Sequence, residues 1–241
     1  MSALAVMLIA IGVADIVRRV TDRLWLSAVL APVVVVGCAA LAALWHVGDI
    51  ALLLIAAAAG VGWVLLSARS ERTGRGEVAP LLVFGAGMAS LILLSGCGSD
   101  VGGLVARWPG WTGIDVSGDR LLMIVGVTLM QLVTGNQLVR LVLASVGAVK
   151  PVGEPQPSDR LKGGRLLGPM ERVLVLGLGL AGQLAAAGAV LAAKSIIRFP
   201  EINAQKTREN GQIGIDEITE YFLVGSFASW IVALGGLALA Q

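Results

Sequence analysis

The sequence has few charged residues, few aromatic residues and almost no cysteine or histidine. Charged residues make up 14% of the 241 positions, whereas a soluble domain usually has about 25%, so an ordinary soluble domain is excluded. His46 is the only histidine, and Cys38 and Cys97 stand apart, without Cys-x-x-Cys or Cys/His spacing. The sequence therefore predicts no metal site, no redox framework and no cofactor. A formal net charge of +2 is too small to predict a nucleic-acid partner.

Long apolar runs are what the sequence has instead. Hydrophobic residues account for 56% of the chain, and the mean hydropathy is +0.86. The 32 glycines, with many alanines and valines, supply the small side chains that let helices pack closely in lipid. A transmembrane barrel would need short alternating segments in place of these long runs. The sequence therefore predicts an all-α, polytopic transmembrane helical bundle.

The apolar runs predict about seven spans and a division of the chain into three parts. The glycine-rich connector 95–119, with Trp108 and Trp111, is predicted to be a loop at headgroup depth. Residues 1–149 form a five-span bundle, 150–168 a cytoplasmic Pro/Gly linker, and 169–241 a two-helix membrane unit. The predicted spans are Ser2–Val17, Leu24–Trp45, Ala51–Ala68, Leu81–Leu94, Leu121–Val149, Pro169–Phe199 and Asp216–Ala240.

Lysine and arginine in the connectors predict how the spans are oriented. With the N-terminus outside, eleven of these residues face the cytoplasm and six face outside, which fits the positive-inside rule. Seven spans then place the C-terminus in the cytoplasm. The last outer loop is an exception, because it carries Lys194, Arg198, Lys206 and Arg208. Either the count is wrong by one helix, or these charges are held there for function.

Polar side chains inside the spans form a predicted intramembrane face. Such groups should point into the bundle, because facing lipid is costly. Hydrogen bonding between helices is favoured over a transport path as their role. On a continuous sixth helix, Arg172, Gln183 and Lys194 recur every eleven residues and share one side. The whole face comprises Gln131, Asn136, Gln137, Arg140, Arg172 and Gln183.

Charged residues also gather at the ends of two predicted spans. Asp15, Arg18, Arg19 and Asp22 follow helical spacing, which predicts an ion-paired ledge at the membrane boundary. Near the C-terminus, the predicted ligand- or lipid-binding residues are Lys194, Arg198, Glu217, Glu220 and Tyr221. Ion pairs between these cations and carboxylates would make a structural clamp. The alternative is that the two cations hold an anionic headgroup or a substrate phosphate.

Three stretches resemble a known family. GRLLGPMER, AAKSIIRF and EYFLVGS are similar to the C-terminal half of a bacterial membrane family, domain of unknown function 3307, over about a third of the chain. The family's N-terminal histidine motif is not present, and the nearest match is Ala14-Asp15-Ile16. The resemblance implies a polytopic protein of the bacterial inner membrane and supplies no reaction. It draws attention to Glu171, Arg172, Lys194, Ser195, Arg198, Glu220 and Tyr221.

Three functions are compatible with this sequence. The favoured one is a non-enzymatic scaffold or module that binds membrane lipids, anionic ones included, a membrane partner or a second copy of the chain. The second is a small transporter or channel that uses the polar groups of spans five and six. The third is a membrane enzyme acting on a lipid-linked substrate, with Glu220 or Glu171 as base. No nucleophile–base set or phosphate-binding loop is recognisable, so no catalytic residue is predicted.

Overall fold

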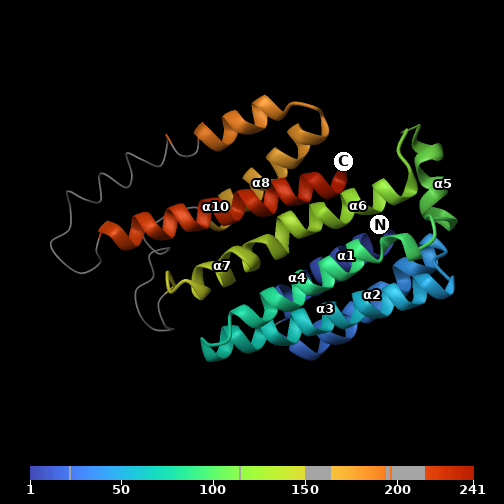
Figure 1. The fold of residues 1–241 in the computed structure, drawn as a ribbon, viewed down its shortest axis with the longest axis horizontal. Coiled ribbons are helices and arrows are strands. Elements are labelled where there is room, and N and C mark those ends of the chain that lie inside the picture. Colours follow the sequence, from blue (N-terminus) through green and yellow to red (C-terminus); the bar gives the residue numbers. More distant parts are fainter. Residues whose placement is uncertain (22, 114, 150–163, 194–195, 197–214) are drawn as a thin grey trace. The chain divides into compact units, whose positions relative to one another are not determined.

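The computed structural model describes residues 1–21, 23–113, 115–149, 164–193, 196 and 215–241. All regular secondary structure in these ranges is helical (Figure 1), which confirms the predicted all-α class for this part of the chain. Four of the described helices are long and apolar enough to cross a membrane, so the chain is a membrane protein; the count of seven spans stays a prediction. These helices are Leu24–Ala42, Val47–Thr73, Gly118–Ser145 and Thr219–Ala240.

The first of two compact units comprises Met1–Thr134 and Leu239–Gln241, and its centre is the first helix. Every residue from Leu4 to Ile11 is less than a tenth exposed, so this stretch is covered on all sides. A helix that is apolar all round belongs in the middle of a bundle. The central helix α1 (Ser2–Thr21) packs against α2 (Leu24–Ala42), α3 (Val47–Thr73), α4 (Val78–Leu93) and α6 (Gly118–Leu129).

Glycines let α1 and α6 approach each other closely. An added Cβ at Gly12 would lie 2.8 Å from the Cβ of Leu129, and one at Gly126 would lie 2.8 Å from the carbonyl oxygen of Ala5. No real side chain tolerates those distances, so larger residues would force these two helices apart. This contact is an example of the small-residue packing that the composition predicts.

The segment between α4 and α6 is more ordered than the sequence predicts. In place of a loop it contains a 3-10 turn, η1 (Ser95–Cys97), and a helix, α5 (Gly103–Thr112). The Asp49 carboxylate, in the first turn of α3, accepts hydrogen bonds from the backbone N–H and the hydroxyl of Ser99, at 2.7 and 2.6 Å. It also accepts one from the backbone N–H of His46, at 3.1 Å. We call this side of the first unit the loop end.

Both ends of this chain lie at the loop end. The Ser2 hydroxyl donates to the carbonyl oxygen of Ser99 at 3.5 Å, beside Asp49. The Arg120 guanidinium, at the start of α6, donates through Nε to the carbonyl oxygen of Ala240 at 3.3 Å. The sequence predicts these two ends on opposite sides of the membrane. The sides of the membrane on which the two ends lie stay a prediction.

The second compact unit comprises Gly135–Ala238. Its helices α8 and α10 run in the same direction, since Arg172 contacts Ser229 and Gly179 contacts Leu237 further along both helices. The described helices of this unit are α7 (Gly135–Ser145), α8 (Gly164–Leu180), the segment Leu184–Ala193 and most of α10 (Ile215–Ala240). The boundary between the units follows Thr134, inside the predicted fifth span, and the predicted linker lies mostly outside the described residues.

The predicted continuous helix Pro169–Phe199 is wrong, because the helix ends at Leu180. Gly182 has a φ of +74°, its N–H donates to Gly179, and the N–H of Gln183 donates to Leu178. This is the hydrogen-bond pattern of a Schellman C-cap, which glycine in the left-handed region makes cheap. A new helix then starts at Leu184. Gln183 therefore follows the end of the helix that contains Arg172, and the predicted face with Lys194, which is outside the described residues, stays a prediction.

The two arms on either side of this turn pack against each other. Val175 and Leu178 of α8 meet Ala187 and Leu191 of the following helix in one apolar cluster, which also includes Ala233 of α10. Residues from both sides of the turn share this cluster, and the second arm turns back after α8 (Figure 1), as in an antiparallel helical hairpin. We call residues 164–193 the C-terminal hairpin.

Replacing Gly182 with alanine should destabilise the C-terminal hairpin by about 1–2 kcal/mol, because a Cβ is disfavoured in the left-handed region. The measurement is the free energy of unfolding in mixed micelles titrated with a denaturing detergent and followed by circular dichroism. Gly177→Ala is the matched control, since a Cβ at Gly177 meets nothing within 4 Å and alanine favours a helix interior. Equal stability of the two variants would contradict the assigned turn.

Candidate functional site

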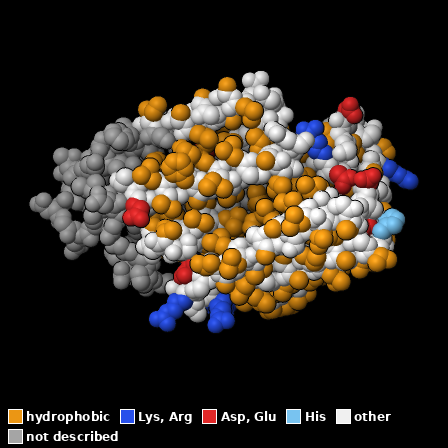
Figure 2. Space-filling view, viewed as in Figure 1, with side chains coloured by type: hydrophobic (Ala, Val, Ile, Leu, Met, Phe, Trp, Pro, Cys, Tyr) orange, Lys and Arg blue, Asp and Glu red, His pale blue; other side chains and the backbone are white. Residues whose placement is uncertain are grey.

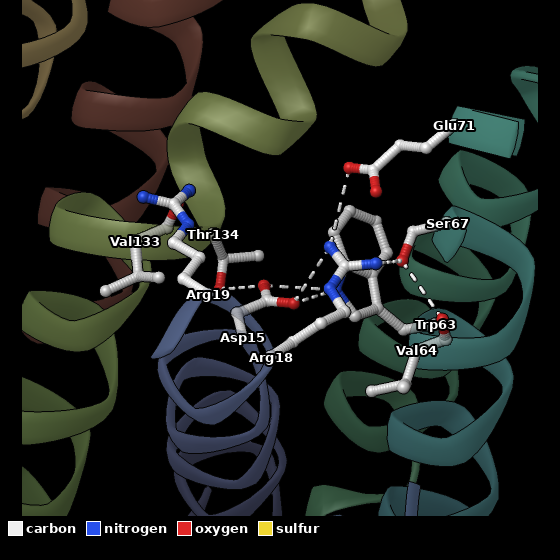
Figure 3. A network of polar contacts seen from close by, with 9 residues as sticks. All are labelled: Asp15, Arg18, Arg19, Trp63, Val64, Ser67, Glu71, Val133 and Thr134. Carbon is white, nitrogen blue, oxygen red and sulfur yellow. Dashed lines mark hydrogen bonds and ion pairs between the residues drawn. The ribbon is translucent and has the colours of Figure 1, made fainter. Parts of the chain in front are cut away.

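A buried carboxylate on the central helix joins three helical elements. Asp15 of α1 is 1% exposed. The indole N–H of Trp63, on α3, lies between its two oxygens and donates at 3.3 and 3.2 Å. Thr134 lies in the helical segment that follows α6, and its hydroxyl donates to Oδ2 at 2.9 Å (Figure 3). Asp15 therefore ties α1 to two neighbours through hydrogen bonds that its two oxygens accept.

Arg18 connects this carboxylate to α3. Its Nη2 lies 3.6 Å from Asp15 Oδ1 and 3.6 Å from Glu71 Oε1, and its Nη1 donates to the Ser67 hydroxyl at 2.9 Å. Side-chain exposure rises along this series, from 2% for Asp15 to 14% for Arg18 and 32% for Glu71. The charges therefore run from the buried interior toward the surface. A buried carboxylate is costly alone, and the neighbouring guanidinium offsets that cost.

The third partner is a π-helical turn. The helix that starts as α6 changes to η2 (Met130–Thr134), a π turn, before it continues as α7. A π turn holds one extra residue and is less favourable than regular helix, so it usually needs support from outside and often marks a functional position. Here α1 gives that support twice: Asp15 accepts from Thr134, and Arg19 Nη2 donates to the carbonyl oxygen of Val133 at 2.8 Å.

Figure 3 shows side chains converging from α1, α3 and the π turn. We call this group the Asp15 cluster; its members are Asp15, Arg18, Arg19, Trp63, Ser67, Glu71 and Thr134. The cluster can do two things chemically. It can fix the register of three helices through hydrogen bonds to one charge, and its carboxylate can take up a proton. It offers no metal site: within the described residues, no three His, Cys, Asp or Glu side chains are grouped so as to hold a metal ion.

A second polar cluster lies in the second unit, around Arg172. This side chain is 2% exposed. Its Nη2 donates to Asn136 Oδ1 of α7 at 2.7 Å, and its Nη1 donates to Ser229 Oγ of α10 at 3.1 Å. The guanidinium packs directly on the backbone of Gly135, where an added Cβ would lie 2.8 Å from Nε. We call Gly135, Asn136, Glu171, Arg172, Ser229 and Trp230 the Arg172 cluster.

Glu171, a base in the enzymatic hypothesis, belongs to this second cluster. It is 7% exposed, and its Oε1 accepts a hydrogen bond from the indole N–H of Trp230 at 3.2 Å. The pairs Arg172–Ser229 and Glu171–Trp230 both fasten α8 to α10, at neighbouring positions on each helix. This geometry is that of a polar contact between packed helices.

The predicted intramembrane residues are not all brought together. Arg172 and Asn136 are hydrogen-bonded, as described above. Gln131 is buried in the π turn and Gln137 is buried in α7, whereas Arg140 is exposed on α7. Gln183 is exposed at the turn of the C-terminal hairpin. The face predicted for spans five and six is therefore divided among several environments.

The predicted binding residues near the C-terminus are only partly described. Lys194 and Arg198 lie outside the described residues, and so does the side chain of Glu217. On α10, Glu220 is exposed and Tyr221 is half-buried. The proposed ion pairs between these cations and carboxylates therefore stay a prediction.

The sequence signalled part of the Asp15 cluster. The predicted pair of Asp15 and Arg18 is confirmed. Asp15 is buried, however, whereas the sequence predicts it on a ledge at the membrane boundary. Asp22, also predicted there, is outside the described residues. Trp63 and Ser67 were missed as partners, although they are four residues apart and so share one side of a helix. The available signal was a carboxylate inside an apolar run, which needs partners of this kind.

Comparisons with protein-family models, with curated proteins and with solved structures return no match for this chain. The resemblance of its C-terminal third to domain of unknown function 3307 therefore stays a prediction, and function has to be argued from the geometry of the two clusters.

Proposed function

We propose that this chain is a non-enzymatic, multi-pass protein of the bacterial inner membrane that acts as a scaffold or a partner-binding module. The observation that carries this proposal is the engagement of the Asp15 carboxylate. Both of its oxygens accept hydrogen bonds from side chains of other helices, and a guanidinium lies beside it. The carboxylate is therefore used to hold helices together, as a clamp.

The contrast with a catalytic carboxylate supports this reading. A general base must reach a substrate proton within hydrogen-bond distance, in a cleft that a substrate can enter. Asp15 is 1% exposed, and both of its oxygens already accept hydrogen bonds from Trp63 or Thr134. Arg172 is equally enclosed, by side chains from α7 and α10.

The surfaces available for lipids or partners are apolar. Figure 2 shows hydrophobic side chains along the helices of the first unit and charged side chains gathered at their ends. Exposed residues on α2 and α10 recur every three or four positions, so each helix presents one continuous apolar face. In a bilayer such faces contact lipid or another membrane helix. These faces comprise Trp25, Val29, Val33 and Val36 on α2, and Leu223, Phe227, Ile231 and Leu234 on α10.

The proposal is tested by identifying what remains bound to the protein. Wild-type protein, extracted gently and examined by native mass spectrometry, should retain a second copy, another membrane chain or specific lipids. Lys194→Ala/Arg198→Ala is compared in parallel to learn whether anionic lipids use those cations. Detection of only the monomer in both samples, with no bound lipid or second chain, would contradict the proposed role as a module.

A second candidate, ion-coupled transport, is favoured by one observation: the π turn lies against an intramembrane carboxylate. π turns and ionisable groups inside membranes both occur at functional positions. Proton flux into liposomes containing the wild-type protein, read with an enclosed pH-sensitive dye, separates the candidates. If the protein is a non-enzymatic module, proton flux should equal that of protein-free liposomes. A flux that is lost in Asp15→Asn would support transport and contradict the module.

A further inference from the structure

The reversal at Gly182 changes which parts of the chain can share a side of the membrane. The apolar run of residues 173–193 has the length of a single span. In the structure it is instead divided by the Schellman cap into two helical arms that pack against each other. A run that turns back on itself returns to the side from which it started.

Contacts with α10 give the direction of each arm. Along α8, Arg172 contacts Ser229 and Gly179 contacts Leu237, so α8 advances toward the C-terminal end of α10. The following arm runs back along α8, and therefore heads toward the start of α10. The turn at Gly182 thus faces the same way as the end of α10.

We infer that the C-terminal hairpin enters the membrane from the cytoplasmic side and returns to it, and that residues 1 and 241 both lie on the outer side. The chain then makes an even number of passes in place of the predicted seven. The first residues of α8 and of α10 then lie on the same, cytoplasmic side. This inference does not depend on whether the protein is a module or a transporter.

The first unit supports this topology independently. Its loop end contains both chain ends, because Ser2 contacts Ser99 and the Ala240 carbonyl contacts Arg120. The backbone N–H of Val101 also donates to Asp119 Oδ2 at 3.0 Å, which joins these two contacts in one region. With a single crossing between residues 164 and 214, α10 would have to end on the opposite side.

The inferred topology also makes the distribution of basic residues consistent with the positive-inside rule. Arg107 and Arg120 are the two that fall on the outer side, and Arg140 and Arg172 lie within helices. The remaining fourteen of eighteen fall in the cytoplasmic connectors or in the helix turns next to them, so the last loop no longer breaks the positive-inside rule. These fourteen are Arg18, Arg19, Arg23, Arg69, Arg72, Arg75, Lys150, Arg160, Lys162, Arg165, Lys194, Arg198, Lys206 and Arg208.

Labelling of single cysteines in intact cells tests this topology. Cys38 is replaced by alanine throughout, and the exposed Cys97 of the loop end serves as the outer control. In a Cys97→Ser background, cysteine is placed at Gln241, at Gln205 or at Arg75, the last being the cytoplasmic control. A membrane-impermeant maleimide should label Cys97 and Gln241→Cys in intact spheroplasts. Gln205→Cys and Arg75→Cys should react only after permeabilisation.

The opposite result at two positions would overturn the inference. If Gln205→Cys reacts in intact spheroplasts and Gln241→Cys is protected, residues 173–193 cross the membrane once. A fusion of alkaline phosphatase after residue 241 gives a second measurement that does not require cysteine substitution. Because this enzyme folds only outside the cytoplasm, the inferred topology predicts an active fusion, and an inactive fusion at normal expression would contradict it.

Discussion

Replacing Asp15 with alanine should destabilise the first unit by about 3–5 kcal/mol, because it leaves a buried charge network without its central partner. Trp63 and Thr134 lose their acceptor, and Arg18 loses a neighbouring carboxylate. Asp15→Asn keeps one acceptor oxygen but removes the charge, so it should cost about 1–3 kcal/mol. The measurement is the free energy of unfolding in mixed micelles.

The matched control for this prediction is Glu71→Gln. Glu71 contacts the same guanidinium, but its side chain is 32% exposed, and partly exposed ion pairs contribute only about 0–1 kcal/mol. Comparable losses in Asp15→Ala and Glu71→Gln would contradict the view that the buried carboxylate is the centre of the cluster.

Replacing Arg172 with alanine should have a comparable effect on the second unit, about 3–5 kcal/mol. The change removes the donors to Asn136 and Ser229 and empties the space of a large buried side chain. Arg172→Lys keeps the charge but not the forked geometry that reaches two partners, so an intermediate loss is expected. Stability is again measured by detergent titration.

Met170→Ala is the control for the Arg172 variants, because this side chain of α8 is 65% exposed and exposed substitutions usually change stability by less than about 0.5 kcal/mol. Gly135→Ala adds a test of the geometry, since its Cβ would lie 2.8 Å from the guanidinium. A Gly135→Ala variant as stable as wild type would show that the side chain does not pack there.

The helical class and most helix positions could be predicted because they depend on composition and on long apolar runs. The predicted spans beginning at Ser2, Leu24 and Asp216 correspond to α1, α2 and α10 within a few residues at each end. The central position of α1 could not be predicted, because an apolar run facing lipid and one buried among helices have similar sequences. Only the contacts of Leu4 to Ile11 distinguish these two cases.

The hairpin was missed for a different reason. Ala181-Gly182-Gln183 lies inside an otherwise apolar run, and glycine is common in transmembrane helices, so Gly182 does not stand out in the sequence as the end of a helix. The same residue is also the usual C-cap of a helix. The four positive charges of the predicted outer loop after residue 193 were the better signal, because a helix count wrong by one was one of the two explanations that they allowed.

The partners of Asp15 depend on tertiary packing and on a π turn. The sequence predicts that a carboxylate within an apolar run needs polar neighbours, and Arg18 at i+3 follows from helical spacing. Trp63 and Thr134 are 48 and 119 residues away along the chain. No periodicity in a single sequence indicates that they meet, or that the helix containing Met130–Thr134 gains an extra residue there.

The most direct test of the account is a double-mutant cycle between Asp15 and Thr134. Stability is measured in mixed micelles for wild type, Asp15→Asn, Thr134→Val and the double variant. If the carboxylate clamps the π turn to α1, the two residues should show a coupling free energy of about 0.5–3 kcal/mol. Effects that add to within about 0.5 kcal/mol would mean that Asp15 does not hold the π turn, and would contradict the structural role on which the proposed function rests.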